Sequence, residues 1–403
     1  ERAMFLEEKG ASADALIDLL AGARRAGAAL TAARRARSRN VRAALRMERV
    51  TALSAGERAR FEAALARYRA ARAELAKDEE RAWQRPRDAE REARSAREAL
   101  LRTSREAMEE AFAVAGEAPA LEGSLVRPAE GEAWLLLHPT GPRACRVLAA
   151  TAQGTKTFVA QASPSDPPAA LAAALLGPLD EALGDVVRLR VLTSGAWQSV
   201  DVHALLFRGE PLVARAAVVF ALDLPPLARS PAPRSGALVV ANPEEDLPET
   251  EREAARARDR LKSSMSVVEL SGRAATKAAF VADVAAASWL HFAGHGRYAA
   301  GWDSGLRMAD GVMFTVRDVL ALPRVPDHVV LSGCETARSA PTRALDLGLP
   351  EAFVVRGAGE VVAAIRPVAD ATAADLVGSL YASAPPGDLA AALASAQRAA
   401  WEG

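Results

Sequence analysis

Residues 289–296 read WLHFAGHG, an apolar run that ends in a glycine, a histidine and a second glycine. A short apolar run bounded by glycine is typical of a buried strand. From residue 236 onward, patterns of this kind alternate with helical patterns, and the other strand-like runs are ALVVAN, SVVEL, DHVVLSG and EVVAAI. This alternation predicts an α/β fold, a mostly parallel sheet flanked by helices.

Two reactive side chains follow two of these predicted strands. His295, with Gly296, comes just past SWLHFA, and Cys334 comes just past DHVVLSG. If these two strands are neighbours in a parallel sheet, about 4.8 Å apart, both side chains emerge at the same rim, within reach of each other. An imidazole favours the thiolate and protonates a leaving amine. We therefore expect Cys334 as nucleophile and His295 as general base and acid, with the amides of Gly296 and Cys334 as oxyanion donors.

Other interpretations of these residues stay open at this point. A buried cysteine at a strand end is more commonly a small core residue. His291 and His295 have the spacing of a zinc pair, but such pairs need a helix and no third ligand is evident, so we expect no metal and no cofactor. His291 fits a hydrogen-bonded core histidine. GAGEVVA at Gly357 imitates a dinucleotide motif, yet it follows a helix and opens a strand, the reverse of what phosphate binding requires.

Composition excludes several classes of partner. The 51 basic side chains equal the 51 acidic ones, so no strong field favours nucleic acid. Two cysteines, Cys145 and Cys334, are too few for a secreted disulfide framework. The chain has no run of about eighteen apolar residues and no signal-peptide core at its start. We expect a cytoplasmic protein that binds neither nucleic acid nor membrane, and, because the sequence starts without Met, a piece of a longer chain.

The pattern divides the chain into three regions, which are residues 1–118, 119–226 and 227–403. The first is rich in Ala, Arg and Glu and predicts a helical hairpin or bundle, with a capping box at Ser54 and Glu57 and a helix boundary at Pro86. Its arginines alternate with glutamates, which favours a solvated face. The second region has short strand-like runs, and LARSPAPRSG at 227–236 is a linker by composition.

Five blocks resemble CHAT-domain proteases of the caspase and separase clan in order and spacing. They are LHFAGHG, DSGLRMADG, VVLSGCETA, EVVAAIRPVADATAADLVGSLY and DLAAALASAQRAAW. The resemblance covers about residues 120–403, loosely in 119–226. It implies a caspase-like fold with a first, catalytically inactive half (119–226) and an active half (227–403). The helical region would be the remnant of a regulatory or tetratricopeptide array, although no repeat of about 34 residues is visible.

The same resemblance implies a cysteine endopeptidase that cleaves a protein or peptide partner, with His295 and Cys334 in the roles given above. It also implies an activating partner that acts through the helical region, and a role in bacterial defence or cell death. The alternative from another class is a catalytically silent CHAT scaffold that serves as a protein-interaction module.

Three further residues are candidates for substrate binding. Arg366 follows the strand EVVAAI, near where caspases carry an arginine in the pocket for the residue before the scissile bond, and would favour an acidic residue there. The alternative is a solvent-facing or salt-bridged Arg366. Asp303 is the competing candidate and would favour a basic residue. Ser332, at the end of DHVVLSG, is the third.

Overall fold

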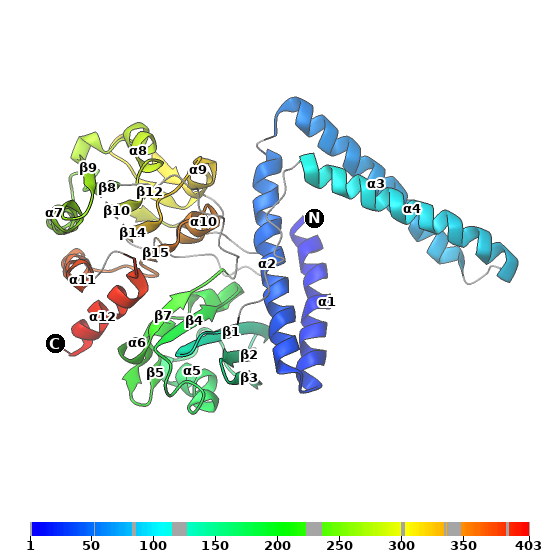
Figure 1. Ribbon diagram of the computed structural model, residues 1–403, viewed down its shortest axis with the longest axis horizontal. Helices are drawn as coiled ribbons and strands as arrows, with labels where there is room; N and C mark the ends of the chain where they lie inside the picture. The colour runs from blue at the N-terminus through cyan, green and yellow to red at the C-terminus, as the bar shows by residue number, and fades with distance from the viewer. Residues whose placement is uncertain are drawn as a thin grey trace. The chain divides into compact units, whose positions relative to one another are not determined.

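The computed structural model describes residues 2–51, 53–82, 86–114, 127–222, 236–299, 303–333, 336, 348–383 and 387–402. The chain divides into two compact units, one formed by Glu1–Asn40 with Gly123–Gly403 and the other by Val41–Glu122. The first unit contains two five-stranded sheets within its described residues. Their strands and covering helices are drawn in Figure 1.

One sheet is parallel throughout, in the order β15-β14-β10-β8-β9. Its strands are β8 (Gly236–Ala241), β9 (Ser266–Ser271), β10 (Trp289–Ala293), β14 (His328–Ser332) and β15 (Glu360–Ala363). Every residue of β10 is buried, whereas all four residues of β15, an edge strand, are half-buried. The middle strand of the sheet, β10, therefore carries the apolar run WLHFA.

Helices cover both faces of this parallel sheet. They are α7 (Pro248–Lys262), α8 (Lys277–Val284), α9 (Val316–Ala321), α10 (Leu349–Val355), α11 (Asp370–Ser383) and α12 (Leu389–Glu402). Side chains of α7, α11 and α12 share one core with Val239, Trp289 and Val330. Helices α8, α9 and α10 lie on the other side of the sheet from α7 and α11 (Figure 1). Covering on both faces explains why these strands read as continuous apolar runs.

The other sheet is mixed and has the order β3-β2-β1-β4-β7. Its strands are β1 (Glu132–Gly141), β2 (Ala144–Thr151), β3 (Gly154–Ala160), β4 (Arg188–Leu192) and β7 (Ala217–Phe220). Strands β1, β4 and β7 are parallel, and β1, β2 and β3 are antiparallel. Helix α5 (Pro168–Leu175) packs on this sheet, and the short elements β5 (Leu206–Phe207), β6 (Glu210–Pro211) and α6 (Leu212–Arg215) precede β7.

Helix α12 joins the two sheets. Ala394 packs with Val213 and Ala217 of the mixed-sheet half. At the start of the helix, Asp388 pairs with Arg188 at 2.5 Å. These contacts link segments 200 positions apart in the chain, so the two sheets form one body.

Helices α1 (Arg2–Gly22) and α2 (Ala26–Thr51) contribute to the core of the mixed sheet. Ile17 and Leu30 are buried against Trp134 and other residues of β1 and β2. The guanidinium of Arg34 lies 4.0 Å from the centre of the Trp134 ring. The division into compact units thus falls among the helices and not at residue 118, where the sequence predicts a boundary. Helical composition does not reveal which helix buries its apolar face against a sheet. The boundaries at 118 and 226 stay predictions.

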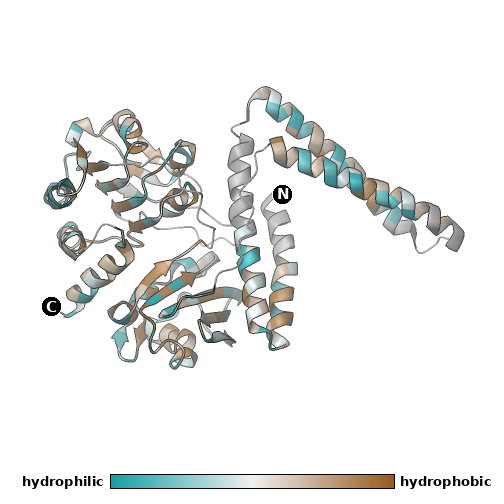
Figure 2. Ribbon diagram, in the orientation of Figure 1, coloured by the Kyte–Doolittle hydropathy of each residue, from teal (hydrophilic) through white to brown (hydrophobic). Residues whose placement is uncertain are grey.

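Helices α3 (Ala55–Ala82) and α4 (Arg87–Val114) form a hairpin in the second unit. The Ser54 N–H donates to Glu57 Oε2 at 3.0 Å and the Glu57 N–H donates to Ser54 Oγ at 3.4 Å, so the predicted capping box is confirmed. The side chains of Leu75 and small alanines of both helices are buried, and hydrophilic residues recur along the rest of their surface (Figure 2). The predicted α/β fold with N-terminal helices is confirmed.

Candidate active site

The site that the sequence predicts lies at the carboxyl ends of β10 and β14. These strands are parallel neighbours, and Ala293 pairs with Ser332. His295 and Cys334 therefore each follow the last paired position by two residues. The Gly294 N–H donates to the Ser332 carbonyl at 3.2 Å, which continues the pairing beyond the strands. Cys334 itself lies outside the described residues, which at this point of the chain are Gly333 and Thr336.

Gly333 packs against the backbone on both sides of His295. A Cβ on Gly333 would stand 2.6 Å from the Gly294 carbonyl oxygen and 3.0 Å from the Gly296 nitrogen. The first distance is shorter than a Cβ atom tolerates and the second is tighter than most Cβ contacts, so glycine lets the two segments approach this closely. The segment that leads into Cys334 thus runs directly beside the histidine loop.

The imidazole of His295 has an acidic partner that the sequence analysis missed. Its Nε2 atom lies 2.9 Å from Oδ2 of Asp246, and the two side chains are 35% and 56% exposed. Asp246 follows β8, which pairs with β10. The signal in the sequence was a run of three acidic residues, Glu244 to Asp246, after a strand of the same sheet. Spacing alone did not tell which of them reaches the histidine.

The loop after His295 continues as a small antiparallel ribbon of β11 (Gly296–Arg297), β12 (Gly305–Arg307) and β13 (Met313–Thr315). The Arg307 N–H donates to the His295 carbonyl at 3.0 Å, and Gly296 is opposite Leu306. This pattern makes Gly296 and Leu306 a pair without mutual hydrogen bonds. The Gly296 N–H therefore points away from β12 and makes no hydrogen bond to it.

Thr336 holds the other end of the segment that contains Cys334. It is buried, and its hydroxyl accepts a hydrogen bond from the Ala364 N–H at 3.2 Å. The same hydroxyl has two carbonyl acceptors within reach, Gly333 at 3.0 Å and Leu331 at 3.3 Å. Thr336 therefore ties the turn after β14 to the backbone just beyond β15.

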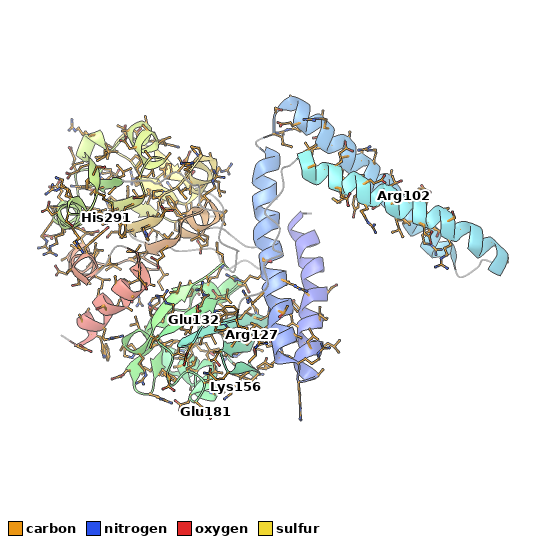
Figure 3. The ribbon with its side chains drawn as sticks, in the orientation of Figure 1. Arg102, Arg127, Glu132, Lys156, Glu181 and His291 are labelled. Carbon is orange, nitrogen blue, oxygen red and sulfur yellow. The ribbon has the colours of Figure 1, made fainter. Side chains whose placement is uncertain are left out.

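A chain of buried polar side chains runs beneath this rim. The Trp289 indole donates to the Tyr381 hydroxyl at 3.0 Å, and that hydroxyl lies 3.2 Å from His291 Nδ1. His291 Nε2 lies 3.1 Å from Oε1 of Glu253, and the Ser332 hydroxyl donates to Oε2 of Glu253 at 2.9 Å. His291, which is labelled in Figure 3, is fully buried and lies within hydrogen-bond distance of Tyr381, so its predicted role as a hydrogen-bonded core histidine is confirmed.

Donor and acceptor capacities define one arrangement for this chain. Because the indole can only donate, the Tyr381 oxygen accepts from it and the Tyr381 O–H donates to His291 Nδ1. His291 then carries its proton on Nε2, which faces Oε1 of Glu253 at 3.1 Å, while Oε2 of Glu253 accepts from the Ser332 hydroxyl. Burial, with a smaller contribution from Glu253, raises the pKa of Tyr381 well above its ordinary value, so the phenol stays a donor.

The three candidates for substrate binding all have partners in the structure. The Ser332 hydroxyl is engaged with Glu253. Arg366 is 66% exposed and its guanidinium pairs with Asp201 of the mixed-sheet half at 2.5 Å, which is the salt-bridged alternative given in the sequence analysis. Asp303 is 3.5 Å from Arg317. A substrate group would have to compete with these partners.

Within the described residues, no group of three or more His, Cys, Asp or Glu side chains is placed to hold a metal ion. Among the described helices, none combines the length and apolar character that crossing a membrane requires.

Comparison with protein families identifies the chain. The model of the CHAT domain matches residues 166–403, more than half of the sequence. The chain belongs to the CHAT-domain family. That is a caspase-like protease family, and the match includes His295, Cys334 and the whole parallel sheet. A comparison with curated proteins gives no significant match.

Among solved structures, the chain is similar to the separase–securin complex of Saccharomyces cerevisiae, with 12% sequence identity and a TM-score of 0.39. The similarity covers 53% of this chain and 14% of that chain. This chain therefore spans only a small part of the structure that it matches.

Proposed function

We propose that this CHAT-domain chain is a cysteine endopeptidase in which Cys334 attacks the scissile carbonyl and His295 handles the proton. One observation carries the proposal, the contact of Gly333 with the backbone of Gly294 and Gly296. It joins the residue before Cys334 to the loop of His295. Supporting it, Ala293 pairs with Ser332, so the two reactive residues hold matched positions past adjacent strands.

In the proposed reaction His295 takes the thiol proton and the Cys334 sulfur bonds to the carbonyl carbon of the substrate. The carbonyl oxygen becomes an oxyanion, which the N–H groups of Gly296 and Cys334 stabilise. The Gly296 N–H suits this role because β12 does not use it. The imidazolium then protonates the leaving amine and leaves a thioester. A water molecule that gives a proton to His295 hydrolyses it and restores the thiol.

We also propose that an extended peptide binds along the outer edge of β15 as an added strand. The N–H groups of Glu360 and Ala364 face the β14 side, since they donate to Asp327 and Thr336. Side-to-side alternation along a strand leaves the backbone groups of residues 361, 363 and 365 directed outward. The half-buried state of all four residues of β15 fits an edge that is open to a partner.

Arg366 and Asp303 remain the two proposals for side-chain preference. Arg366 would bind an acidic residue once the substrate carboxylate displaces Asp201, and Asp303 would bind a basic residue after displacing Arg317. A peptide library decides between them. Cleavage after Asp or Glu favours Arg366, and cleavage after Lys or Arg favours Asp303. Cleavage after apolar residues removes both, and Ser332 as a substrate contact is tested by Ser332→Ala in the same assay.

We further propose a protein substrate, an activating partner that acts through the N-terminal helices, and a cytosolic role in bacterial defence or cell death. The family assignment supports a proteolytic system of this kind. The genes beside this one offer candidate substrates and activators for pull-down and cleavage assays.

The deciding experiment compares the wild type with Cys334→Ala and His295→Ala on a peptide library and on candidate partner proteins. We expect cleavage by the wild type and its loss in both variants. Binding of a partner without cleavage by the wild type would instead favour the silent scaffold. Cys145→Ala is the matched control and should cleave normally, since Cys145 is buried in the mixed sheet.

A further inference from the structure

The carboxylate of Asp246 is the acidic group that the structure places against the proposed catalytic imidazole. Its Oδ2 atom is 2.9 Å from His295 Nε2. An imidazole has two nitrogen atoms, so this contact leaves Nδ1 for the nucleophile. The sequence and the family resemblance pointed to His295 and Cys334 alone, and the contact is a property of this chain's own loop after β8.

The loop that presents Asp246 is fixed by several specific contacts. Asn242 is buried, and its N–H donates to the Ala293 carbonyl at 2.9 Å, which ties the loop to β10. The Asn242 side chain accepts from the Leu247 N–H at 3.0 Å and donates to Glu251 at 3.0 Å. Asn242 and Glu245 both have positive φ angles, 44° and 60°. Such angles cost free energy in residues other than glycine and persist only where the surroundings impose them.

The neighbouring charges have other partners, so Asp246 is the acidic group available to the imidazole. Glu244 pairs with Arg307 at 2.9 Å, and Glu245 pairs with Arg273 at 3.2 Å. Arg297, which follows Gly296, is exposed. Two of the three adjacent acidic residues thus hold arginines and the third holds His295.

We propose that Asp246 is a positioning residue for the proposed peptidase reaction, acting through His295. Asp246 accepts a hydrogen bond from the Nε2–H group. This keeps the neutral ring in the tautomer whose Nδ1 atom is free to take a proton from the Cys334 thiol. When that proton arrives, the imidazolium is bound to a carboxylate on one side and to the thiolate on the other. In this step the only proton that moves goes from sulfur to Nδ1. This inference rests on the proposed function.

The expected effect is moderate because the contact is partly open to solvent. Removing a buried carboxylate from a comparable triad costs about 10⁴ in kcat, while water weakens exposed charge pairs. We therefore expect Asp246→Asn to lower kcat about ten- to a hundredfold with little change in KM. Asp246→Glu should recover part of the loss, since it retains the charge.

The test measures alkylation of Cys334 by iodoacetamide between pH 5 and 9, with the site identified by mass spectrometry. Wild type should react well below about pH 8.5, where a free thiol titrates. Asp246→Asn should react about tenfold more slowly at pH 6, and its profile should move to higher pH. Glu245→Gln is the matched control, because it changes the adjacent acidic residue and should leave the profile unchanged. Burial raises the pKa of Cys145 to about 12, so this thiol serves as the unreactive internal reference.

A second measurement does not depend on the thiol. Nitrogen chemical shifts of the His295 ring, recorded in Cys334→Ala, report which nitrogen carries the proton. We expect the Nε2–H tautomer, and a mixture of tautomers once Asp246→Asn is added. An unchanged tautomer and an unchanged alkylation profile in Asp246→Asn would overturn the positioning role while the peptidase stands. Wild-type alkylation that resembles a free thiol and ignores His295→Ala would instead count against the peptidase itself.

Discussion

The Gly294 carbonyl oxygen lies 2.6 Å from the point where a side chain on Gly333 would begin. The two residues directly follow the adjacent parallel strands β10 and β14, and their contact is between backbone atoms. Backbone atoms cannot rotate away as a side chain does, so an added methyl group must push the two strand ends apart. The geometry of the proposed site therefore depends on the absence of a side chain at residue 333.

Gly333→Ala should lower the free energy of unfolding by about 1–3 kcal/mol, the usual cost of overpacking, and reduce peptide cleavage by more than tenfold. Urea denaturation and the peptide assay measure the two effects. Gly177→Ala is the control, since a Cβ there meets no atom within 4 Å. Normal activity in Gly333→Ala would show that the strand ends can separate without cost to the site.

Glu253→Ala should be among the most destabilising single substitutions in the parallel-sheet half. It removes the acceptor for Ser332 and the carboxylate that faces His291 Nε2 inside the core. Leaving a buried donor without its acceptor costs about 1–3 kcal/mol. Asp259→Asn, on the same helix and 67% exposed, should change stability by less than about 0.5 kcal/mol. Urea unfolding curves compare the two variants, and equal midpoints would contradict the importance of the buried chain.

Thr336→Val should impair both stability and cleavage, although it preserves the size of the side chain. The Ala364 N–H loses its acceptor, at a cost of about 1–3 kcal/mol, and the end of β14 loses its tie, through residue 336, to the backbone beyond β15. Thr336→Ser retains the hydroxyl and should behave much more like wild type in urea unfolding and in the peptide assay. If valine is tolerated and serine is not, the methyl group of Thr336 matters and the hydroxyl does not.

His203 should make the protein less stable in mild acid. Burial lowers the pKa of this imidazole below its ordinary value of 6.5, while Asp201 and Gln397 oppose the shift. The unfolded chain therefore binds a proton at His203 more readily than the folded chain does. Stability from this group is complete above pH 6.5 and is lost as the pH falls below it. Urea unfolding between pH 7.5 and 5 should show a shallower decline for His203→Gln, and an identical decline would assign the slope to other groups.

The sequence by itself predicted the alternation of strands and helices from residue 236 to the end, because each strand is a short apolar run and each helix has its own period and boundary residues. The expected site depended on the condition that WLHFAG and HVVLSG lie side by side, and the pairing of β10 with β14 meets it. These features are local, or follow from the general rule that parallel strands end at one rim. His291 was identified as a core histidine because it lies within the apolar run of a predicted buried strand, and it is fully buried.

Only the tertiary structure decided which distant residues meet. Asp246, in the loop after β8, reaches His295 after the neighbouring strand β10, and Arg366 is paired with Asp201, 165 positions away. The first forty residues belong with the mixed sheet because Ile17 and Leu30 bury their side chains against it. Such contacts depend on loop paths and on which helix face finds a partner. The order of residues along the chain shows which side chains are charged or apolar. Which of them pair with one another is decided only when the whole chain packs.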